Sequence, residues 1–131
     1  MIDIMKRYNF LFFFLFLLFL VLPRQAQAQN AAQAVDTVLL VNGVCGMCER
    51  VIEKAALLPG VFEAQWDQES KILALRYDSA AVELPAISAA IAQSGYDTEY
   101  LTAPDSAYQD LHHCCHYRDP EIIEEHQAQK R

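Results

Sequence analysis

The sequence has few basic residues: ten Lys and Arg stand against seventeen Asp and Glu, giving a formal net charge of −7 over 131 residues. A chain this acidic repels the phosphate backbone of nucleic acids, which argues against DNA or RNA as a partner. The sequence also lacks any pattern that would supply a Ser-His-Asp set, a carboxylate pair in a marked cleft or a phosphate-binding loop. We therefore expect a protein that is not an enzyme.

A hydrophobic run of transmembrane length is missing as well. The longest apolar stretch, residues 10–22, has 13 residues, whereas a helix needs about 20 to cross a bilayer. Two basic residues precede this stretch and an Ala-x-Ala site at residues 26–28 follows it, as in a secretory signal peptide. We predict a signal peptide at residues 1–28, a mature chain that begins at Gln29, and export across the inner membrane to the periplasm. A retained membrane anchor is the alternative.

The remaining residues are enough for one domain with one hydrophobic core. We expect a short leader at residues 29–34, a folded domain at 35–102 and a tail at 103–131. Periodicity and turn residues predict strands at 35–41, 62–66, 71–78 and 96–101, and helices at 47–58 and 85–94. This βαββαβ order is typical of a ferredoxin-like α+β sandwich, in which two helices cover one face of a four-stranded antiparallel sheet.

Alternation of apolar and polar residues predicts which side chains of the hairpin face the core. The inward positions are expected to be Phe62, Ala64 and Trp66 in the first strand and Leu73, Leu75 and Tyr77 in the second. The tail has few apolar residues, so we expect it to pack weakly on the domain or to remain mobile.

Cys45 and Cys48 lie where the first predicted strand gives way to the first predicted helix. Unpaired backbone N–H groups and the positive end of the helix dipole favour a thiolate at that position. Because glycines surround the pair, we expect it to be exposed. Two neighbouring thiolates prefer soft ions such as Cu(I) or Hg(II), whereas zinc usually takes four ligands.

Two other functions fit the same cysteine pair. A periplasmic thiol–disulfide protein also places a C-x-x-C motif at a helix start, although only some sixteen mature residues precede Cys45 here. A structural disulfide or an inert buried pair is the remaining alternative. Attachment of a c-type haem would need His directly after the second cysteine, and Glu49 stands there. The residues favour metal binding and leave the redox function as its rival.

A second group of potential ligands lies in the tail. It consists of His112, His113, Cys114, Cys115 and His116. Short Cys/His tracts commonly bind metal, and adjacent cysteines are poor disulfide partners because their Cα atoms lie closer together than a disulfide requires. We predict that these residues either complete the site of the first pair, admitting Zn(II) as well as Cu(I), or form a separate site that loads and unloads it. His126 stands alone on a polar segment and is expected to be solvated.

Residues 36–101 resemble the heavy-metal-associated domain found in copper chaperones, in the amino-terminal modules of metal-pumping ATPases and in the periplasmic mercury-binding protein. The matching pieces are "VNGVCGMC", "ALLPGV", "WDQESKILALRYD" and "AIAQSGYD", in the family's order. The resemblance implies that Cys45 and Cys48 are the metal ligands and that Tyr96 lies close beneath the metal-binding loop. The loop departs from the family pattern, since Val44 stands where Met is typical and Met47 falls between the cysteines as a further candidate ligand.

Together these features predict an exported heavy-metal-binding protein that captures or ferries a soft ion in metal transport, homeostasis or detoxification. Copper(I) is the expected ion, with mercury and zinc as alternatives. The expected recipient is a membrane metal transporter or efflux component. We expect a monomer, with a metal-bridged dimer as the alternative.

Overall fold

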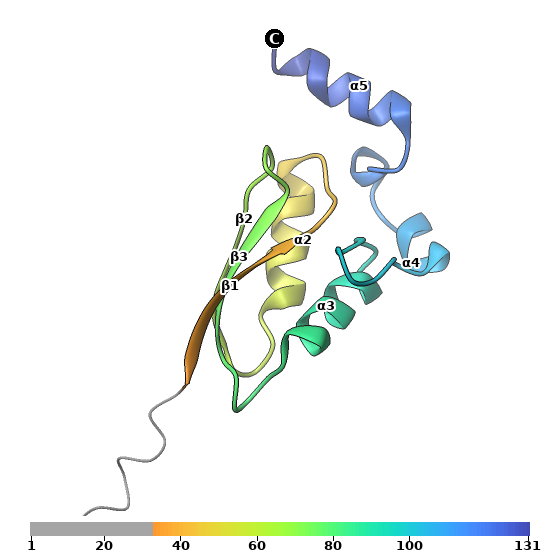
Figure 1. Cartoon of the computed structure of the whole chain (residues 1–131). Helices are drawn as coiled ribbons and strands as arrows, with labels where there is room; N and C mark the ends of the chain where they lie inside the picture. Colours follow the sequence, from red (N-terminus) through yellow and green to blue (C-terminus); the bar gives the residue numbers. More distant parts are fainter. Residues whose placement is uncertain (1–32) are drawn as a thin grey trace, which may run out of the picture. The chain divides into compact units, whose positions relative to one another are not determined.

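The computed structural model describes residues 33–131, and Figure 1 shows the course of the chain. The predicted signal peptide and most of the predicted leader lie outside the described residues. The elements are β1 (Ala34–Leu40), α2 (Gly46–Ala56), β2 (Val61–Trp66), β3 (Ile72–Asp78), α3 (Leu84–Gln93), α4 (Asp105–Gln109), the 3₁₀ helix η2 (His113–Cys115) and α5 (Pro120–Gln129). The predicted order of strand, helix, strand, strand and helix is confirmed.

The three strands form one antiparallel sheet in the order β1-β3-β2. In its register Leu39 of β1 and Trp66 of β2 both pair with Leu73 of the central strand β3. Because side chains alternate across a strand, these three residues share one face of the sheet, and all three are buried. The α+β fold with an antiparallel sheet is therefore confirmed.

Helices α2 and α3 lie on the same side of the sheet (Figure 1). Ile52 of α2 and Ile87 and Ile91 of α3 are fully buried, so the apolar stripe of each helix faces the core. The opposite face of the sheet carries exposed apolar side chains, among them Val38 and Leu40. Within residues 33–131, one face of the sheet is thus covered by the helices and the other is not.

The predicted fourth strand at 96–101 is wrong for the part of the chain that the structure describes. Only one isolated bridge, between Val41 and Thr98, joins this segment to the end of β1. The Thr98 hydroxyl accepts a hydrogen bond from the Leu101 backbone N–H at 3.0 Å, and the Thr98 N–H donates to the Leu101 carbonyl at 2.8 Å. These local bonds turn the chain back on itself, so a ladder cannot continue.

The prediction that Phe62 faces the core is also wrong. The register between β2 and β3 shifts between Val61 and Glu63, which makes Phe62 the extra residue of a β-bulge. Its side chain is 50% exposed, whereas Trp66, beyond the bulge, is buried as predicted. An alternating pattern could not reveal this change because a single inserted residue inverts the inward and outward positions.

The tail is packed against the domain, contrary to the expectation that it packs weakly. Cys115, Tyr117 and Ile122 are each at most 7% exposed and belong to the same hydrophobic core as the sheet and helices. Within residues 33–131, no helix has the length and apolar character needed to cross a membrane.

Candidate metal centre

The loop between β1 and α2 places the first two cysteines. Cys45 is the N-cap residue of α2, and Cys48 lies in the first turn of the helix. The Val44 backbone N–H donates to the Cys48 sulfur at 3.4 Å, and the Gln68 side-chain amide donates to the Val44 carbonyl at 2.6 Å. These contacts fix the loop so that both sulfurs lie at the amino-terminal end of the helix, where the helix dipole favours negative charge.

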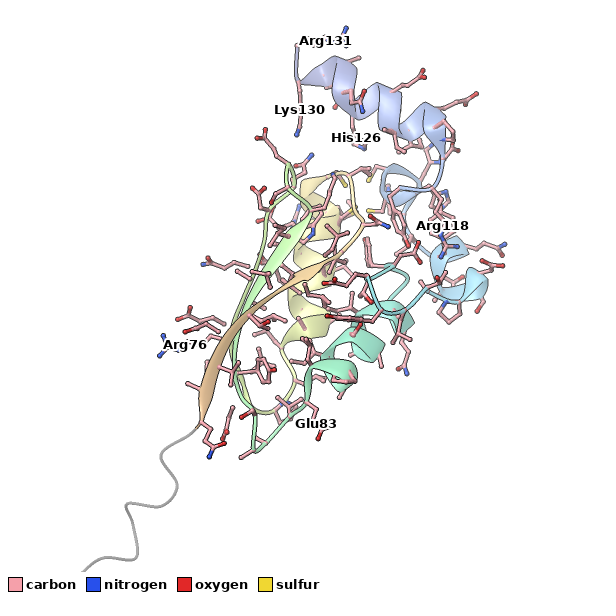
Figure 2. All side chains as sticks on the ribbon, in the orientation of Figure 1. Arg76, Glu83, Arg118, His126, Lys130 and Arg131 are labelled. Atoms are coloured by element: carbon pink, nitrogen blue, oxygen red, sulfur yellow. The ribbon has the colours of Figure 1, made fainter. Side chains whose placement is uncertain are left out.

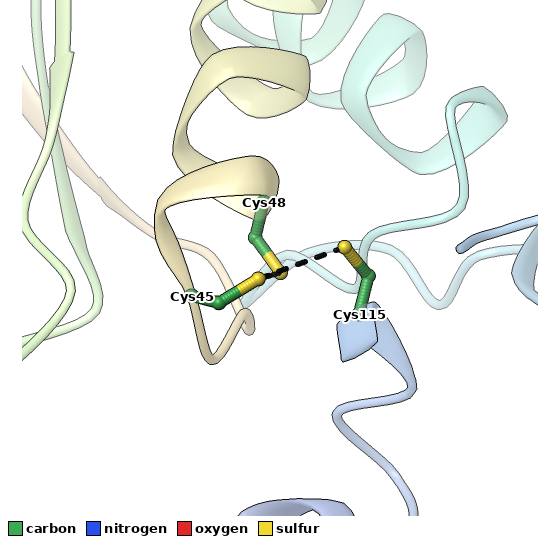
Figure 3. A group of neighbouring side chains, drawn as sticks. All are labelled: Cys45, Cys48 and Cys115. Carbon is green, nitrogen blue, oxygen red and sulfur yellow. Dashed lines mark hydrogen bonds between the residues drawn. The ribbon is translucent and has the colours of Figure 1, made fainter. Parts of the chain in front are cut away.

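A third sulfur, that of Cys115, joins this pair from the tail (Figure 3). The Cys45 sulfur lies 3.4 Å from that of Cys48 and 3.7 Å from that of Cys115, and all three sulfurs lie within 4.8 Å of one another. Two sulfurs that bind one ion at about 2.3 Å lie roughly 3.8–4.0 Å apart in a tetrahedral or trigonal arrangement. A small opening of the Cys45–Cys48 pair therefore lets the three sulfurs surround a single soft ion.

The cysteine pair is buried, which corrects the expectation that the loop is exposed. Cys45 is 9% exposed, Cys48 is fully buried and Cys115 is 1% exposed. The glycines of the loop, Gly43 and Gly46, do not by themselves leave the sulfurs open to water, because the tail covers them. Cys115 from the tail therefore both covers the cysteine pair and adds the third sulfur.

The residues that follow Cys115 hold it against the pair. The Tyr117 hydroxyl donates to the Gly95 carbonyl at 2.9 Å and accepts from the Asp97 backbone N–H at 2.8 Å. The Tyr117 ring stacks on Tyr96, with centroids 5.7 Å apart. A tyrosine two positions beyond Cys115 is thereby locked to the segment that follows α3.

Arg118 reinforces the same attachment (Figure 2). Its Nη2 and Nε donate to the two carboxylate oxygens of Asp97 at 2.7 and 3.1 Å, the two-pronged geometry that makes such pairs specific. Its Nη1 also reaches Asp105 at 3.1 Å, and its guanidinium lies 4.4 Å from the centre of the Tyr108 ring. We call Tyr117 and Arg118, together with their partner Asp97, the tail latch.

Gly95 permits the close approach of the tail. Its φ is +101°, a conformation that residues with a side chain rarely adopt. A Cβ at this position would lie 2.7 Å from the Ala107 carbonyl oxygen and 2.8 Å from Leu111 Cδ2. Any larger residue would therefore push away the segment that leads to Cys115.

The sulfurs of the loop differ in their tendency to ionise. Burial acts to raise the pKa of Cys45, but the backbone N–H groups of Cys48 and Met47 and the Cys48 side chain outweigh it, so the pKa is lowered overall. Burial raises the pKa of Cys48 and Cys115. Cys45 is consequently the sulfur that loses its proton most readily, and it offers an arriving cation a thiolate at the start of the helix.

The Tyr96 hydroxyl lies under this cluster, as the family resemblance implies. Its pKa is raised by burial and by the negative charge that Cys48 and Cys115 can carry. Among the described residues it is the buried side-chain polar atom that has no hydrogen-bond partner. A hydroxyl in this position can donate to a thiolate once the sulfurs lose their protons.

The structure divides the other predicted ligands into two groups. Cys114 is partly buried, with its sulfur 3.9 Å from those of both Cys45 and Cys115, and His112 Nδ1 lies 3.4 Å from the Cys114 sulfur. His113 and His116 contact each other edge to face, with ring centroids 5.8 Å apart. The structure thus brings Cys114 and His112 to the edge of the cluster, while His113 and His116 pack together.

Two further expectations concern His126 and Met47. His126 is not simply solvated, since its Nε2 lies 3.0 Å from the Cys114 carbonyl oxygen and its side chain is partly buried. Helix α5 therefore touches the Cys/His tract through this residue (Figure 2). Met47 is 38% exposed, in keeping with a side chain that faces solvent.

Sequence reasoning missed the tail latch. The signal that could have revealed it is the pair Tyr117-Arg118 directly after a Cys/His tract in an otherwise polar tail. An aromatic residue next to an arginine commonly anchors a segment, because the ring supplies apolar contact and the guanidinium binds carboxylates. Its partner Asp97, 21 positions away in sequence, could not be found by any local rule.

The fold and site together define a small α+β domain that gathers thiols at the start of its first helix. No family model matches the sequence, and the search of curated proteins finds no match. Among solved structures, the chain is similar to a Bacillus anthracis str. Ames protein assigned as copper-ion-binding, at 30% identity over 53% of this chain and 100% of the other, with a TM-score of 0.50.

Two further solved structures are similar at lower TM-scores. One is a CopZ metallochaperone, 30% identical over 49% of this chain and 98% of the other, with a TM-score of 0.47. The other is the water-soluble region of the P-type ATPase CopA from Bacillus subtilis, 28% identical over 51% of this chain and 46% of the other, with a TM-score of 0.48. Because about half of this chain matches the Bacillus anthracis protein over that protein's whole length, this chain belongs to the heavy-metal-associated domain family.

Proposed function

We propose that this protein binds one Cu(I) ion through the thiolates of Cys45, Cys48 and Cys115 and passes it to another protein. The observation that supports this most directly is the convergence of the three sulfurs to within 4.8 Å. Thiolates select soft ions, and the three buried sulfurs without Cys114 are one fewer than the four ligands that a structural zinc site usually has. The similarity to a protein assigned as copper-ion-binding points to the same ion.

Burial of the sulfurs supports a carrier over a thiol–disulfide protein. A dithiol that reduces other proteins must present an accessible thiolate to a disulfide of its substrate. Here Cys48 is fully buried, and Cys115 covers the pair from the tail side. A single ion can enter such a site by ligand exchange, whereas a protein disulfide would have to displace the tail.

We further propose that the protein works outside the cytoplasm, in the periplasm, and delivers its ion to a membrane metal transporter or efflux component. The support for export is the signal-peptide pattern at residues 1–28. A carrier in that compartment would meet Cu(I) before it enters the cell or after it leaves. A role in copper transport, homeostasis or detoxification follows from this placement.

The test is a competitive titration of the reduced mature protein with Cu(I) and a chromogenic Cu(I) chelator. We expect one ion to be bound tightly, and the double variant Cys45→Ser/Cys48→Ser to weaken binding by roughly 100-fold or more, because two of three thiolate donors are lost. Met47→Leu serves as the matched control, since it changes the sulfur residue between the two cysteines and should leave the affinity unchanged.

Circular dichroism of each variant establishes that the domain remains folded. If the double serine variant folds and binds Cu(I) as tightly as the natural protein, the assignment of Cys45 and Cys48 is wrong. Preference for Zn(II) over Cu(I) in the same titration would contradict the assignment of the ion.

A further inference from the structure

The cluster has an inner and an outer part. The inner sulfurs of Cys45, Cys48 and Cys115 are at most 9% exposed. Cys114 is only partly buried, and His112 beside it is exposed. Water and other molecules can therefore reach the cluster at Cys114 and His112, while the inner sulfurs lie behind them.

Short distances connect the two parts. The Cys114 sulfur lies 3.9 Å from that of Cys45 and 3.9 Å from that of Cys115. On its other side it lies 3.4 Å from His112 Nδ1. A sulfur and an imidazole nitrogen that bind one ion at about 2.3 and 2.0 Å lie roughly 3.5 Å apart in a tetrahedral arrangement. Cys114 and His112 thus already have the spacing of two ligands of a single ion.

We propose that Cys114 and His112 form a transfer position through which Cu(I) enters and leaves the inner three-sulfur site. This inference rests on the proposed function, because it assigns the route by which the ion of that site is exchanged. The ligand class is a soft monovalent cation, Cu(I) or its analogue Ag(I), presented by a donor protein or small thiol. The Cys114 and Cys115 sulfurs lie 3.9 Å apart, close to the spacing of roughly 3.8–4.0 Å expected for two sulfurs that share one ion.

The transfer step is an exchange of ligands at constant oxidation state. A bond forms between the ion and the Cys114 sulfur, whose proton passes to water, and the His112 Nδ1 lone pair completes the outer position. The bonds from the ion to the three inner sulfurs then break one after another, and each sulfur takes up a proton from water as its bond breaks. The copper remains Cu(I) throughout, so no oxidant or reductant takes part.

The neighbouring histidines are excluded from this role by their contacts. His116 Nε2 lies 3.2 Å from the Leu111 carbonyl oxygen, and its ring lies 5.1 Å from that of Tyr108. His113 contacts the His116 ring. Within residues 33–131, no hydrogen bond joins either histidine to a cysteine. His113 therefore provides a matched comparison for His112, one position away in the same tract.

The test measures equilibrium affinity and transfer rate separately in the full-length mature protein. Stopped-flow absorbance follows the release of Cu(I) to an excess of chromogenic chelator, and competitive titration gives the affinity. For Cys114→Ser/His112→Ala we expect the release rate to fall about tenfold or more, equivalent to about 1.4 kcal/mol in the barrier, while the affinity changes by less than about threefold. His113→Ala should leave both quantities unchanged.

X-ray absorption at a second equivalent of Cu(I) gives an independent readout of the outer position. We expect imidazole scattering that disappears in His112→Ala and persists in His113→Ala. A release rate that is unchanged or faster in Cys114→Ser/His112→Ala overturns the proposal, as does a second equivalent that shows no imidazole ligand. Failure of the natural protein to bind even the first Cu(I) tightly would instead refute the proposed function, so the two failures are distinguishable.

Discussion

Two tyrosines that stack on each other have opposite roles at the level of single residues. The Tyr117 hydroxyl makes two hydrogen bonds, to the Gly95 carbonyl and from the Asp97 N–H. The Tyr96 hydroxyl is buried beneath the sulfurs without a partner. A buried hydroxyl without a partner costs stability, and its position suggests that it serves the thiolates of the metal-bound protein.

We therefore predict that Tyr96→Phe leaves the free energy of unfolding of the reduced metal-free protein unchanged or raises it by up to about 1 kcal/mol. The same change should weaken Cu(I) binding severalfold, because the thiolates lose a hydrogen-bond donor. Urea denaturation and competitive titration measure the two effects.

The matched control for this change is Tyr117→Phe, which removes the same hydroxyl from the neighbouring ring. It should lower the free energy of unfolding by about 1–3 kcal/mol, because two buried backbone groups lose their partner. Equal destabilisation by both variants would show that the Tyr96 hydroxyl is bonded in the folded protein.

At the level of elements, the tail latch decides whether η2 lies on the start of α2. Asp97 and Arg118 are 18% and 27% exposed at their side chains, so their ion pair is only weakly screened by water. Burial acts to raise the pKa of Asp97, but hydrogen bonds from Arg118 and the Ala103 N–H outweigh it and lower the pKa overall. The latch therefore stabilises the fold only while Asp97 is ionised.

This pKa shift predicts how stability depends on pH. Because the pKa of Asp97 is lower in the folded chain than its unfolded value of about 3.9, its contribution is fully present above that value and is lost as the pH falls through the folded pKa. At pH 7, Asp97→Asn should lower the free energy of unfolding by about 1.5–3 kcal/mol. At about pH 3 the difference in free energy of unfolding between Asp97→Asn and the natural protein should become smaller. Urea denaturation at both pH values measures it.

Asp105→Asn provides the comparison, because Asp105 contacts the same guanidinium but is 87% exposed. An exposed ion pair contributes about 0–1 kcal/mol to stability. The free energy of unfolding of Asp105→Asn should therefore lie close to that of the natural protein at both pH values. A loss for Asp97→Asn that is as large in acid as at neutral pH would contradict the role assigned to the carboxylate.

At the level of the whole molecule, the proposed export determines where the thiols operate. The cysteines of the described chain are free and close together, so an oxidising compartment would favour disulfides between them. A bound Cu(I) ion protects the thiolates from oxidation to disulfides, because their lone pairs are then shared with the metal. Export and metal loading are therefore linked in the proposed function.

We predict that the protein recovered from the periplasm has the mass of residues 29–131, because the Ala-x-Ala site at 26–28 fits signal-peptide cleavage. Ala28→Arg should block this cleavage, since the site requires small residues, whereas Gln27→Leu should leave it intact. Intact-mass spectrometry of the cell fractions measures cleavage in the natural protein and in both variants. A full-length protein in the membrane fraction would instead support the retained anchor.

Local patterns predicted most of the domain correctly. The apolar stripes of α2 and α3 repeat with the helical period, and Leu73, Leu75 and Tyr77 alternate along β3; all of these patterns are set by residues a few positions apart. The bulge at Phe62 and the turn at Thr98 escaped prediction because hydrogen bonds to particular neighbours, rather than periodicity, decide them.

The proximity of Cys45 and Cys48 at the start of a helix is a local property of the sequence, because a spacing of three residues at a strand-to-helix junction is enough to bring them together. Which tail residue completes the cluster depends instead on the three-dimensional packing of the tail. Cys115 lies 70 positions beyond Cys45, and Cys114 beside it has the same chemistry. The choice between them follows from the Tyr117 and Arg118 contacts, which close the tail over the loop, and such contacts depend on where the chain folds back in space.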